Sequence, residues 1–283
     1  MKVTFWGVRG SIPVPGSTTQ KYGGNSSCVE LEMDDGKRII FDAGSGIRLL
    51  GQKIMKSAGR HSMHLMLSHG HMDHVHGFPF FGPAYMRGNH ITVTGCATEG
   101  RTVKQMLQRQ MGDIYFPIEF DGLPAEIDYL DHCSIDNKTK VGKSKIDTCE
   151  TNHPGGGVSY KVIEKKKVLV YMTDNELMSD AAGAKPFEHF VDFVKGADVL
   201  IHDTQYTPQE YKHTKGWGHS RYTDSALLAV KAGVKKLVLF HHDPDHNDAK
   251  IDWMVGKTAG EVAKLGGKGI KCMAAREKSS IVL

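Results

Sequence analysis

Short apolar runs recur along the whole chain and alternate with longer segments of helical periodicity. The runs are bounded by turn signals such as Gly23-Gly24-Asn25, and they predict strands. The predicted strands are 2–7, 28–33, 38–42, 63–67, 90–95, 145–151, 157–163, 166–172, 197–202, 236–241 and 269–274. The predicted helices are 46–58, 99–111, 186–195, 222–233 and 249–265, whereas residues 112–140 are expected to be irregular. This pattern predicts strand-rich layers in the centre of the molecule, with helices outside them.

Polar side chains that can carry chemistry follow many of these strands at the point where each strand ends. They are Asp42, His69–His74, His153, Asp174, His202-Asp203 and His241-His242. Strand ends that converge on one edge are where enzymes with helices and sheets build their sites. The sequence therefore predicts one site at one edge of the strand layers.

The densest of these clusters is the segment 69–74, which reads H-x-H-x-D-H. Neutral imidazoles and carboxylates are ligands that suit zinc and similar divalent metals. His69 and His71 are two residues apart and can point to one side, whereas Asp73 and His74 follow a turn and can reach a second site. This geometry favours a two-metal centre over a single structural ion. The alternative is a polar loop in which some of the 16 histidines cluster by chance.

Composition narrows the class of protein without naming a substrate. The length of 283 residues fits one domain spanning 1–283, and the net charge of +4 is compatible with an anionic substrate but too weak to argue for nucleic acid. No apolar stretch reaches transmembrane length and no signal segment is evident, so we expect a cytoplasmic protein without a membrane partner. The five widely spaced cysteines favour reduced thiols: Cys28, Cys96, Cys133, Cys149 and Cys272.

The order of the motifs resembles the metallo-β-lactamase superfamily over nearly the whole chain, from Phe5-Trp6-Gly7 to the last strand. The matching positions are His69, His71, Asp73, His74, His153, Asp174 and His241. The resemblance implies an α+β fold, a four-layer αββα sandwich with metals at one edge of its two sheets. It also implies two divalent ions, zinc or alternatively manganese.

The resemblance assigns each ligand to an ion. One metal is held by His69, His71 and His153. The second is held by Asp73, His74 and His241, and Asp174 bridges the two ions. Asp42 resembles the family's carboxylate that orients a ligand histidine; its alternative role is to cap the helix that follows.

A further set of motifs is similar to the tRNA 3′-processing endonuclease (RNase Z) and its smaller phosphodiesterase relatives. It comprises Ala197–Thr204, Gly218-His219-Ser220 and Lys236–His241. The similarity implies an acid–base pair in which His219 protonates the leaving ribose oxygen and Asp203 holds its ring. Asp73 joins them among the implied catalytic residues. The alternative for His219 is a loop histidine without a catalytic role.

RNase Z inserts a long tRNA-gripping arm at a place where this chain has only the short segment between His153 and Asp174. The chain is therefore more similar to the phosphodiesterases that act on small or cyclic substrates. The function implied is metal-hydroxide attack on a small or cyclic nucleotide or ribose phosphodiester, with His219 as general acid.

Several alternatives stay open at this point. The chain is alternatively an RNA-processing nuclease, a thioester or lactone hydrolase on the same metals, or a ligand-binding sensor on a retained fold. A small phosphodiester is the favoured partner, nucleic acid is not favoured, and a homodimer is expected by resemblance alone. The aromatic segments 77–85 and 111–117 are either a pocket wall that stacks on a base or a hydrophobic packing loop.

Overall fold

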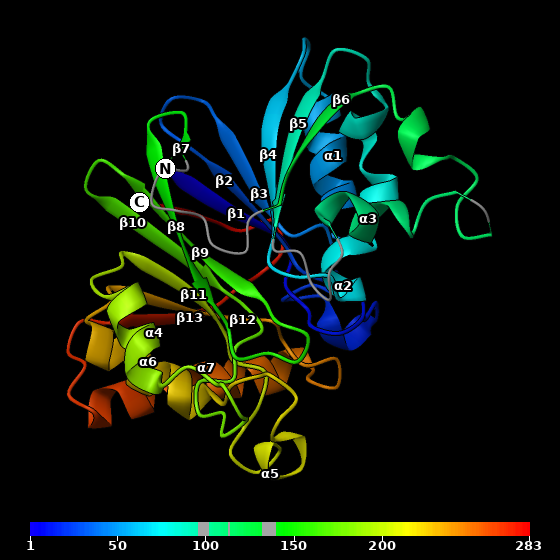
Figure 1. The fold of residues 1–283 in the computed structure, drawn as a ribbon. Coiled ribbons are helices and arrows are strands. Elements are labelled where there is room, and N and C mark those ends of the chain that lie inside the picture. The colour runs from blue at the N-terminus through cyan, green and yellow to red at the C-terminus, as the bar shows by residue number, and fades with distance from the viewer. Residues whose placement is uncertain (96–101, 113, 132–139) are drawn as a thin grey trace.

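The computed structural model describes residues 1–95, 102–112, 114–131 and 140–283. Two mixed β-sheets face each other, and helices cover the outer side of each sheet (Figure 1). This is the four-layer αββα sandwich expected from the sequence, which is thereby confirmed.

The first sheet has the strand order β14-β1-β2-β3-β4-β5-β6 among the described residues. Its strands are β1 (Lys2–Gly7), β2 (Cys28–Glu32), β3 (Arg38–Phe41), β4 (Ser62–Leu67), β5 (His90–Gly95), β6 (Glu126–Asp131) and β14 (Ser280–Val282). Strands β14 to β3 pair antiparallel, and β3 to β6 pair parallel. The helices that cover this sheet are α1 (Ile47–Met55) and α3 (Val103–Gln108).

The second sheet has the order β13-β12-β11-β10-β9-β8-β7 over the same described ranges. Its strands are β7 (Lys140–Val141), β8 (Ser144–Glu150), β9 (Val158–Glu164), β10 (Lys167–Met172), β11 (Val199–Asp203), β12 (Lys236–Phe240) and β13 (Lys271–Ala274). Its outer face is covered by α4 (Phe187–Val194), α6 (Tyr222–Ala232) and α7 (Asp248–Lys264). Two single-turn helices, α2 (Met72–Val75) and α5 (Tyr211–Thr214), lie in the loops.

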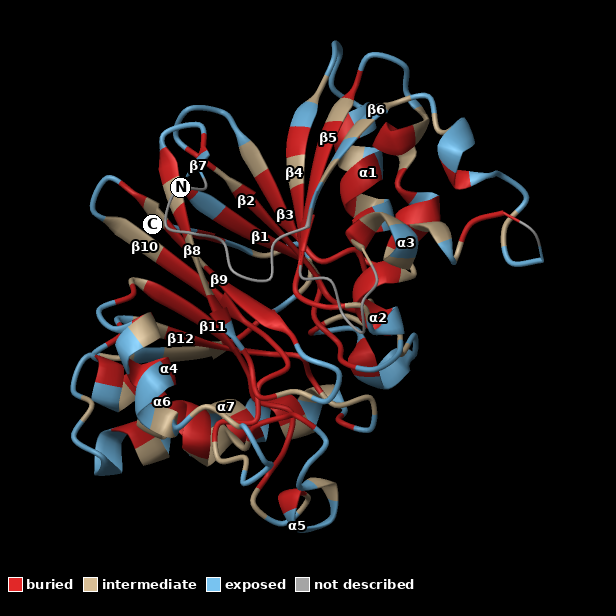
Figure 2. Ribbon diagram, in the orientation of Figure 1, coloured by how far each residue is buried: buried red, intermediate tan, exposed pale blue. Residues whose placement is uncertain are grey.

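Buried residues run through the strands of both sheets, whereas the helices carry both buried and exposed residues (Figure 2). The central core lies between the sheets and includes a run of aromatic contacts. Phe41 stacks on Tyr171 with ring centroids 5.0 Å apart, and Tyr171 meets Phe240 edge-on at 5.6 Å. Aromatic packing between β3 and the strands β10 and β12 thus holds the two sheets together beside the predicted site.

Strand β6 is the main error of the sequence prediction, which treats residues 112–140 as irregular. Three of its residues are carboxylates, a composition that is depleted in strands. Its position at the edge of the sheet, hydrogen-bonded to β5, makes it a strand, and Ile127 and Tyr129 are half-buried between exposed neighbours. The predicted helix 99–111 is shorter, since α3 ends at Gln108; residues 99–101, Cys96 and Cys133 lie outside the described ranges.

Within the part of the chain that the structure describes, no helix is both long and apolar enough to cross a membrane. The described cysteines, Cys28, Cys149 and Cys272, are unpaired, in agreement with the expectation of reduced thiols.

Strand direction brings the polar clusters of the sequence to one edge. Strands β3 and β4 are parallel in the first sheet, and β10, β11 and β12 are parallel in the second. Strand β8 runs in the direction of β10 because both are antiparallel to β9. All of these strands therefore deliver the residues at, or shortly after, their carboxyl ends to the same region.

The aromatic contact between the sheets predicts a large stability effect. Phe41→Ala removes a fully buried ring, so we expect the free energy of unfolding, measured by urea titration, to fall by about 3–5 kcal/mol. The control Phe80→Ala, at a side chain that is 58% exposed, should cost less than about 1 kcal/mol. Similar losses in the two variants would contradict a central role for the inter-sheet core.

Candidate metal centre

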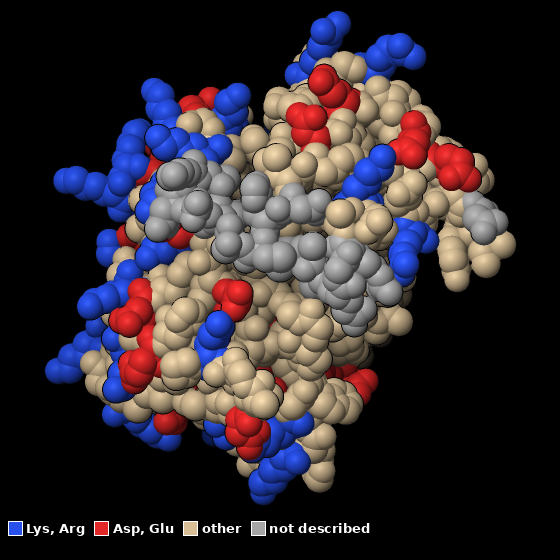
Figure 3. All heavy atoms as spheres, viewed as in Figure 1, with Lys and Arg blue, Asp and Glu red and all other residues tan. Residues whose placement is uncertain are grey.

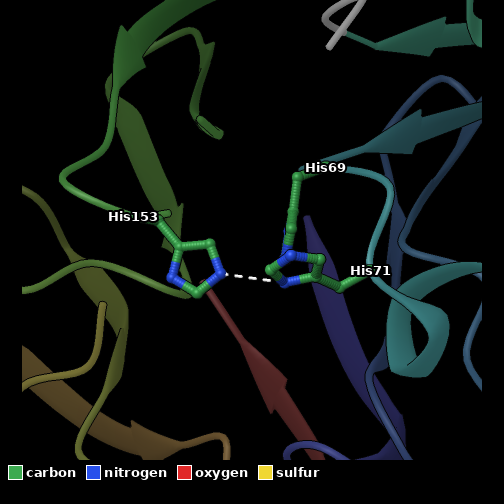
Figure 4. A group of neighbouring side chains, drawn as sticks. All are labelled: His69, His71 and His153. Atoms are coloured by element: carbon green, nitrogen blue, oxygen red, sulfur yellow. Dashed lines mark hydrogen bonds between the residues drawn. The ribbon is translucent and has the colours of Figure 1, made fainter. Parts of the chain in front are cut away.

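Three imidazoles converge from two loops at the edge of the sandwich. His69 and His71 lie in the β4–α2 loop, and His153 lies in the β8–β9 loop, with the rings turned toward one another (Figure 4). The ligand atoms of this trio all lie within 4.8 Å of one another, and His153 Nε2 is 3.0 Å from His71 Nδ1. The spacing suits a single ion held by three neutral imidazoles.

A second group lies deeper and combines Asp73, His74 and His241. The Nε2 atoms of His74 and His241 are both 3.1 Å from Asp73 Oδ2. All three residues are buried. The group presents two nitrogens and a carboxylate to one point, which is a second place that could hold a divalent ion.

Asp174 lies between the two groups. Its Oδ1 is 3.3 Å from Nε2 of both His74 and His241. Its Oδ2 is 3.7 Å from Nε2 of both His69 and His153. Each oxygen thus faces one group, as a bridging carboxylate would, and the structure brings together all seven residues expected as ligands.

Hydrogen bonds on Nδ1 turn the histidines so that Nε2 faces the cluster. His74 Nδ1 donates to Asp42 Oδ2 at 2.8 Å, and His241 Nδ1 donates to Gln205 Oε1 at 2.8 Å. His153 Nδ1 donates to the carbonyl oxygen of Gly218 at 3.1 Å. Such outer contacts fix the tautomer and leave the inner nitrogen lone pair for a metal.

Asp42 is the centre of a buried network behind His74. It accepts hydrogen bonds from Ser68 N at 2.7 Å, from Ser68 Oγ at 2.9 Å and from Tyr171 Oη at 2.6 Å. The carboxylate thus orients His74, one of the expected ligands, in the way that the resemblance implied. The alternative of a helix cap is wrong, because the N-cap of α1 is Gly46 and no side chain caps it.

The ionisation of the outer trio suits metal binding. Burial lowers the pKa of His69 well below its usual value and lowers the pKa of His153 to about 4. Both rings are therefore neutral at physiological pH, which is the form that binds metals. Moreover, Nε2 of His69 is buried without a hydrogen-bond partner among the described residues, a costly arrangement that a bound cation would relieve.

The two buried carboxylates of the cluster, Asp73 and Asp174, have lowered pKa values. Burial by itself would raise the pKa of Asp73 and Asp174, but the adjacent His74 and His241 hold both pKa values well below the usual range. Burial likewise opposes a charge on His74, yet Asp73, Asp174 and Asp42 raise its pKa well above normal. The carboxylates around His74 thus favour positive charge at this point of the cluster. The residues therefore fit a pair of divalent ions.

Three of the residues at this edge leave their strands through left-handed backbone. Their φ angles are 61° for Asp42, 50° for Asp174 and 59° for His241. This region is uncommon for residues other than glycine, and such strain gathers at functional sites. Here it turns each side chain sharply off the end of β3, β10 or β12 toward the cluster.

A histidine–aspartate pair lies against the cluster on the side of the second sheet. His219 Nδ1 donates to Asp203 Oδ2 at 2.7 Å and lies 4.0 Å from Asp174 Oδ2. The ring of His219 stacks on that of His241 with centroids 5.0 Å apart. Burial opposes a charge on His219, but Asp203 and the nearby carboxylates raise its pKa to about 9. His219 is thus protonated at neutral pH, with Nε2 not engaged by Asp203.

The sequence prediction missed Ser68, Tyr171 and Gln205, which orient the ligands from behind. The only signal in the sequence was proximity, since each lies one to three residues from a motif position. The aromatic segment 77–85 is a packing element, because Phe78 and Phe81 are fully buried in the core under α1. The cavity beside His71, of about 280 Å³, is lined instead by Met106, Arg109 and Gln110 together with the two motif loops.

The comparisons with known proteins agree with this geometry. Residues 37–242 match the family model described as the β-lactamase superfamily domain. Ribonuclease Z of Picrophilus torridus is 23% identical over 290 residues, covering 88% of this chain and 88% of that protein.

Two solved structures share the fold. A diphosphatase from the PhnP family matches with a TM-score of 0.67 at 17% identity, covering 100% of this chain and 97% of that one. The Zn²⁺-bound PqqB from Methylobacterium extorquens matches with a TM-score of 0.68 at 16% identity, covering 100% of both chains. Because the family model spans most of the chain and contains every motif from Asp42 to His241, the chain belongs to the β-lactamase superfamily, with the metallo-β-lactamase fold and RNase Z-like relatives.

Proposed function

We propose that residues 1–283 form a single hydrolase domain that cleaves phosphodiesters with two divalent metal ions, zinc in the first instance. His69, His71 and His153 would hold one ion, and Asp73, His74 and His241 the other, with Asp174 between them. The Zn²⁺-bound relative PqqB supports zinc, and manganese is the alternative. When bound, such ions polarise a phosphodiester and supply a water nucleophile that is deprotonated at neutral pH.

The observation that carries the proposal is the His219–Asp203 pair beside the cluster. Cleaving a phosphodiester at a sugar oxygen releases a strongly basic alkoxide, which needs a proton donor. Asp203 holds Nδ1 of His219, so the proton available for transfer is on Nε2. A thioester hydrolase on the same cluster would expel a weakly basic thiolate and would leave this pair without a clear role.

The size of the substrate is argued from the loops. Between His153 and Asp174 the chain forms only the hairpin of strands β9 and β10, so there is no arm to grip a large RNA at that place. The cavity beside His71, of about 280 Å³, is at the small end for ligand pockets. The PhnP-family diphosphatase, a protein of the same fold, supports phosphorus chemistry at such a site. We therefore favour a small or cyclic nucleotide or ribose phosphate.

An RNA-processing nuclease is the second candidate, because Ribonuclease Z of Picrophilus torridus matches over most of both chains. The surface charge supports it weakly. On the face shown in Figure 3, basic side chains lie mostly along the outer margin with acidic ones among them, and the net charge is +4. A binding stripe for a polyanion would require a more continuous basic surface.

The test of the function is turnover of bis(p-nitrophenyl) phosphate, a panel of 2′,3′- and 3′,5′-cyclic nucleotides and a tRNA precursor, with metal content measured on the same sample. We expect about two divalent ions per chain and hydrolysis of a small diester that chelator abolishes and zinc or manganese restores. Cleavage of the precursor alone would favour the nuclease. Two bound ions with no phosphodiester cleavage would favour a thioester or lactone substrate.

Substitutions of Asp174 and His219 are expected to differ in their effect on metal content. Asp174→Ala removes the residue that faces both groups, so metal content and activity should be lost together. His219→Ala should retain both ions and lower kcat on a ribose-leaving substrate by roughly 10²–10⁴-fold, as for a general acid. Its control is His213→Ala, in the exposed part of α5, which should match the wild type. Metal loss in the His219 variant would refute its assignment as the acid.

The pH profile should report the Asp203 contact. His219 donates only while protonated, so activity falls as the pH rises through its pKa, which the carboxylate of Asp203 raises. Asp203→Asn removes that support, and the alkaline limb of kcat/KM should move to lower pH. Asp198→Asn, which alters a carboxylate paired with Lys235 just before β11, is the control and should leave the limb in place. An unmoved limb in the Asp203 variant would contradict the pairing as the source of the raised pKa.

A further inference from the structure

A buried carboxylate lies beside the cluster without belonging to either ligand group. Glu176 is 2% exposed and follows Asp174 by two residues, in the loop after β10. Burying a carboxylate is costly unless several donors converge on it. The donors that converge on Glu176 come from the segment that carries His219 and from α5, so the residue joins separate parts of the chain.

Two of these donors are the backbone amides of Gly216 and Gly218, in the turn that precedes His219. Gly216 N lies 2.9 Å from Glu176 Oε1 and 3.1 Å from Oε2. Gly218 N lies 3.1 Å from Oε2, and Tyr211 Oη donates to Oε1 at 2.5 Å. The carboxylate therefore holds both ends of the turn 216–218.

The residue after His219 is tied to the same short stretch of chain. Ser220 Oγ donates to the carbonyl oxygen of Asn175 at 2.5 Å and accepts from Leu177 N at 3.1 Å. The residues on both sides of His219, Gly218 and Ser220, are thus hydrogen-bonded to the segment 175–177. The placement of its ring is set from the loop that also carries Asp174.

The same turn supports a second histidine. The carbonyl oxygen of Gly218 accepts the hydrogen bond from His153 Nδ1 at 3.1 Å. Gly218 has a φ of +87°, and a Cβ at this position would lie 2.0 Å from that nitrogen. Only glycine lets the backbone approach His153 so closely, so the Gly218 peptide links Glu176 to both His153 and His219.

We infer that Glu176 is a positioning residue, which holds the turn 216–218 so that His219 is placed to protonate the leaving oxygen. The inference rests on the function proposed above. The carboxylate of Glu176 accepts from Gly216, Gly218 and Tyr211, and none of these donors is a proposed metal ligand. A displacement of about 1 Å in a reacting group can cost roughly 10²-fold in rate. Loosening the turn should therefore impair the step that needs a proton and spare a reaction that does not.

The leaving group of the substrate separates these two cases. Glu176→Gln keeps the shape of the side chain but replaces one carboxylate oxygen by an amide NH₂. The NH₂ group cannot accept from the backbone N–H groups of the turn, so the hydrogen bonds to that oxygen are lost. We would measure kcat/KM on bis(p-nitrophenyl) phosphate, whose p-nitrophenolate leaves without a proton, and on the best ribose-leaving substrate among cyclic nucleotides and dinucleotides. The expected loss is about 10- to 100-fold on the ribose-leaving substrate and below about threefold on the aryl diester, with unchanged metal content.

Two further variants keep the test sharp. Glu30→Gln alters another buried carboxylate, on strand β2, which accepts from Trp6, Arg38 and Lys53, and it should leave the ratio of the two activities unchanged. Tyr211→Phe removes a single donor from Glu176 and should give a smaller loss of the same kind, which serves if the Gln variant does not fold.

Equal losses on both substrates, loss of metal from a folded variant, or unchanged rates would each overturn the inference. The first two outcomes would make Glu176 a structural residue, and the third would give it no role in the reaction. A wild-type protein that cleaves neither kind of diester would instead remove the phosphodiesterase proposal, and this inference with it. The two failures are therefore distinguishable.

Discussion

The concentration of buried carboxylate and imidazole at one edge of the sandwich is the constraint on which the rest of this structure depends. Asp73 and Asp174 are both buried, and four Nε2 atoms face them at 3.1 to 3.7 Å. Anionic groups and lone pairs packed this closely are unfavourable without compensating positive charge. The carboxylates raise the pKa of His74 because they favour a positive charge beside them. A pair of divalent ions would supply more positive charge than one protonated imidazole.

The fold meets this constraint by orienting the expected ligand histidines through hydrogen bonds on their outer ring nitrogen. Nδ1 of His74, His153 and His241 donates to Asp42, Gly218 and Gln205 respectively, and these acceptors come from different loops. Asp42 is in turn held by Tyr171, which stacks on Phe41 between the sheets. The hydrophobic contact of the two sheets and the polar arrangement of the edge are thus continuous, so the core determines the geometry of the cluster.

The proposed acid, His219, is positioned by segments on the side of the second sheet. Asp203 is delivered by β11, whereas His219 comes from a loop that is held to the segment 175–177. The loop after β10 therefore carries a residue that faces both ligand groups and also anchors the loop of the acid. Within about four consecutive residues, this arrangement couples the proposed metal ligands to the proposed proton donor.

The sequence by itself determined most of the fold and the set of candidate ligands that the fold brings together. H-x-H-x-D-H places four side chains able to bind metal in one contiguous segment, and the apolar runs predict all the central strands because buried strands need continuous hydrophobic residues. Tertiary structure alone decided the rest. Strand β6 is set by pairing with its neighbour, Phe78 and Phe81 are set by packing, and Gln205 and Glu176 are set by contacts across loops. Hydrogen bonds between distant segments depend on how the layers are spaced and turned, and no local spacing of residues encodes that.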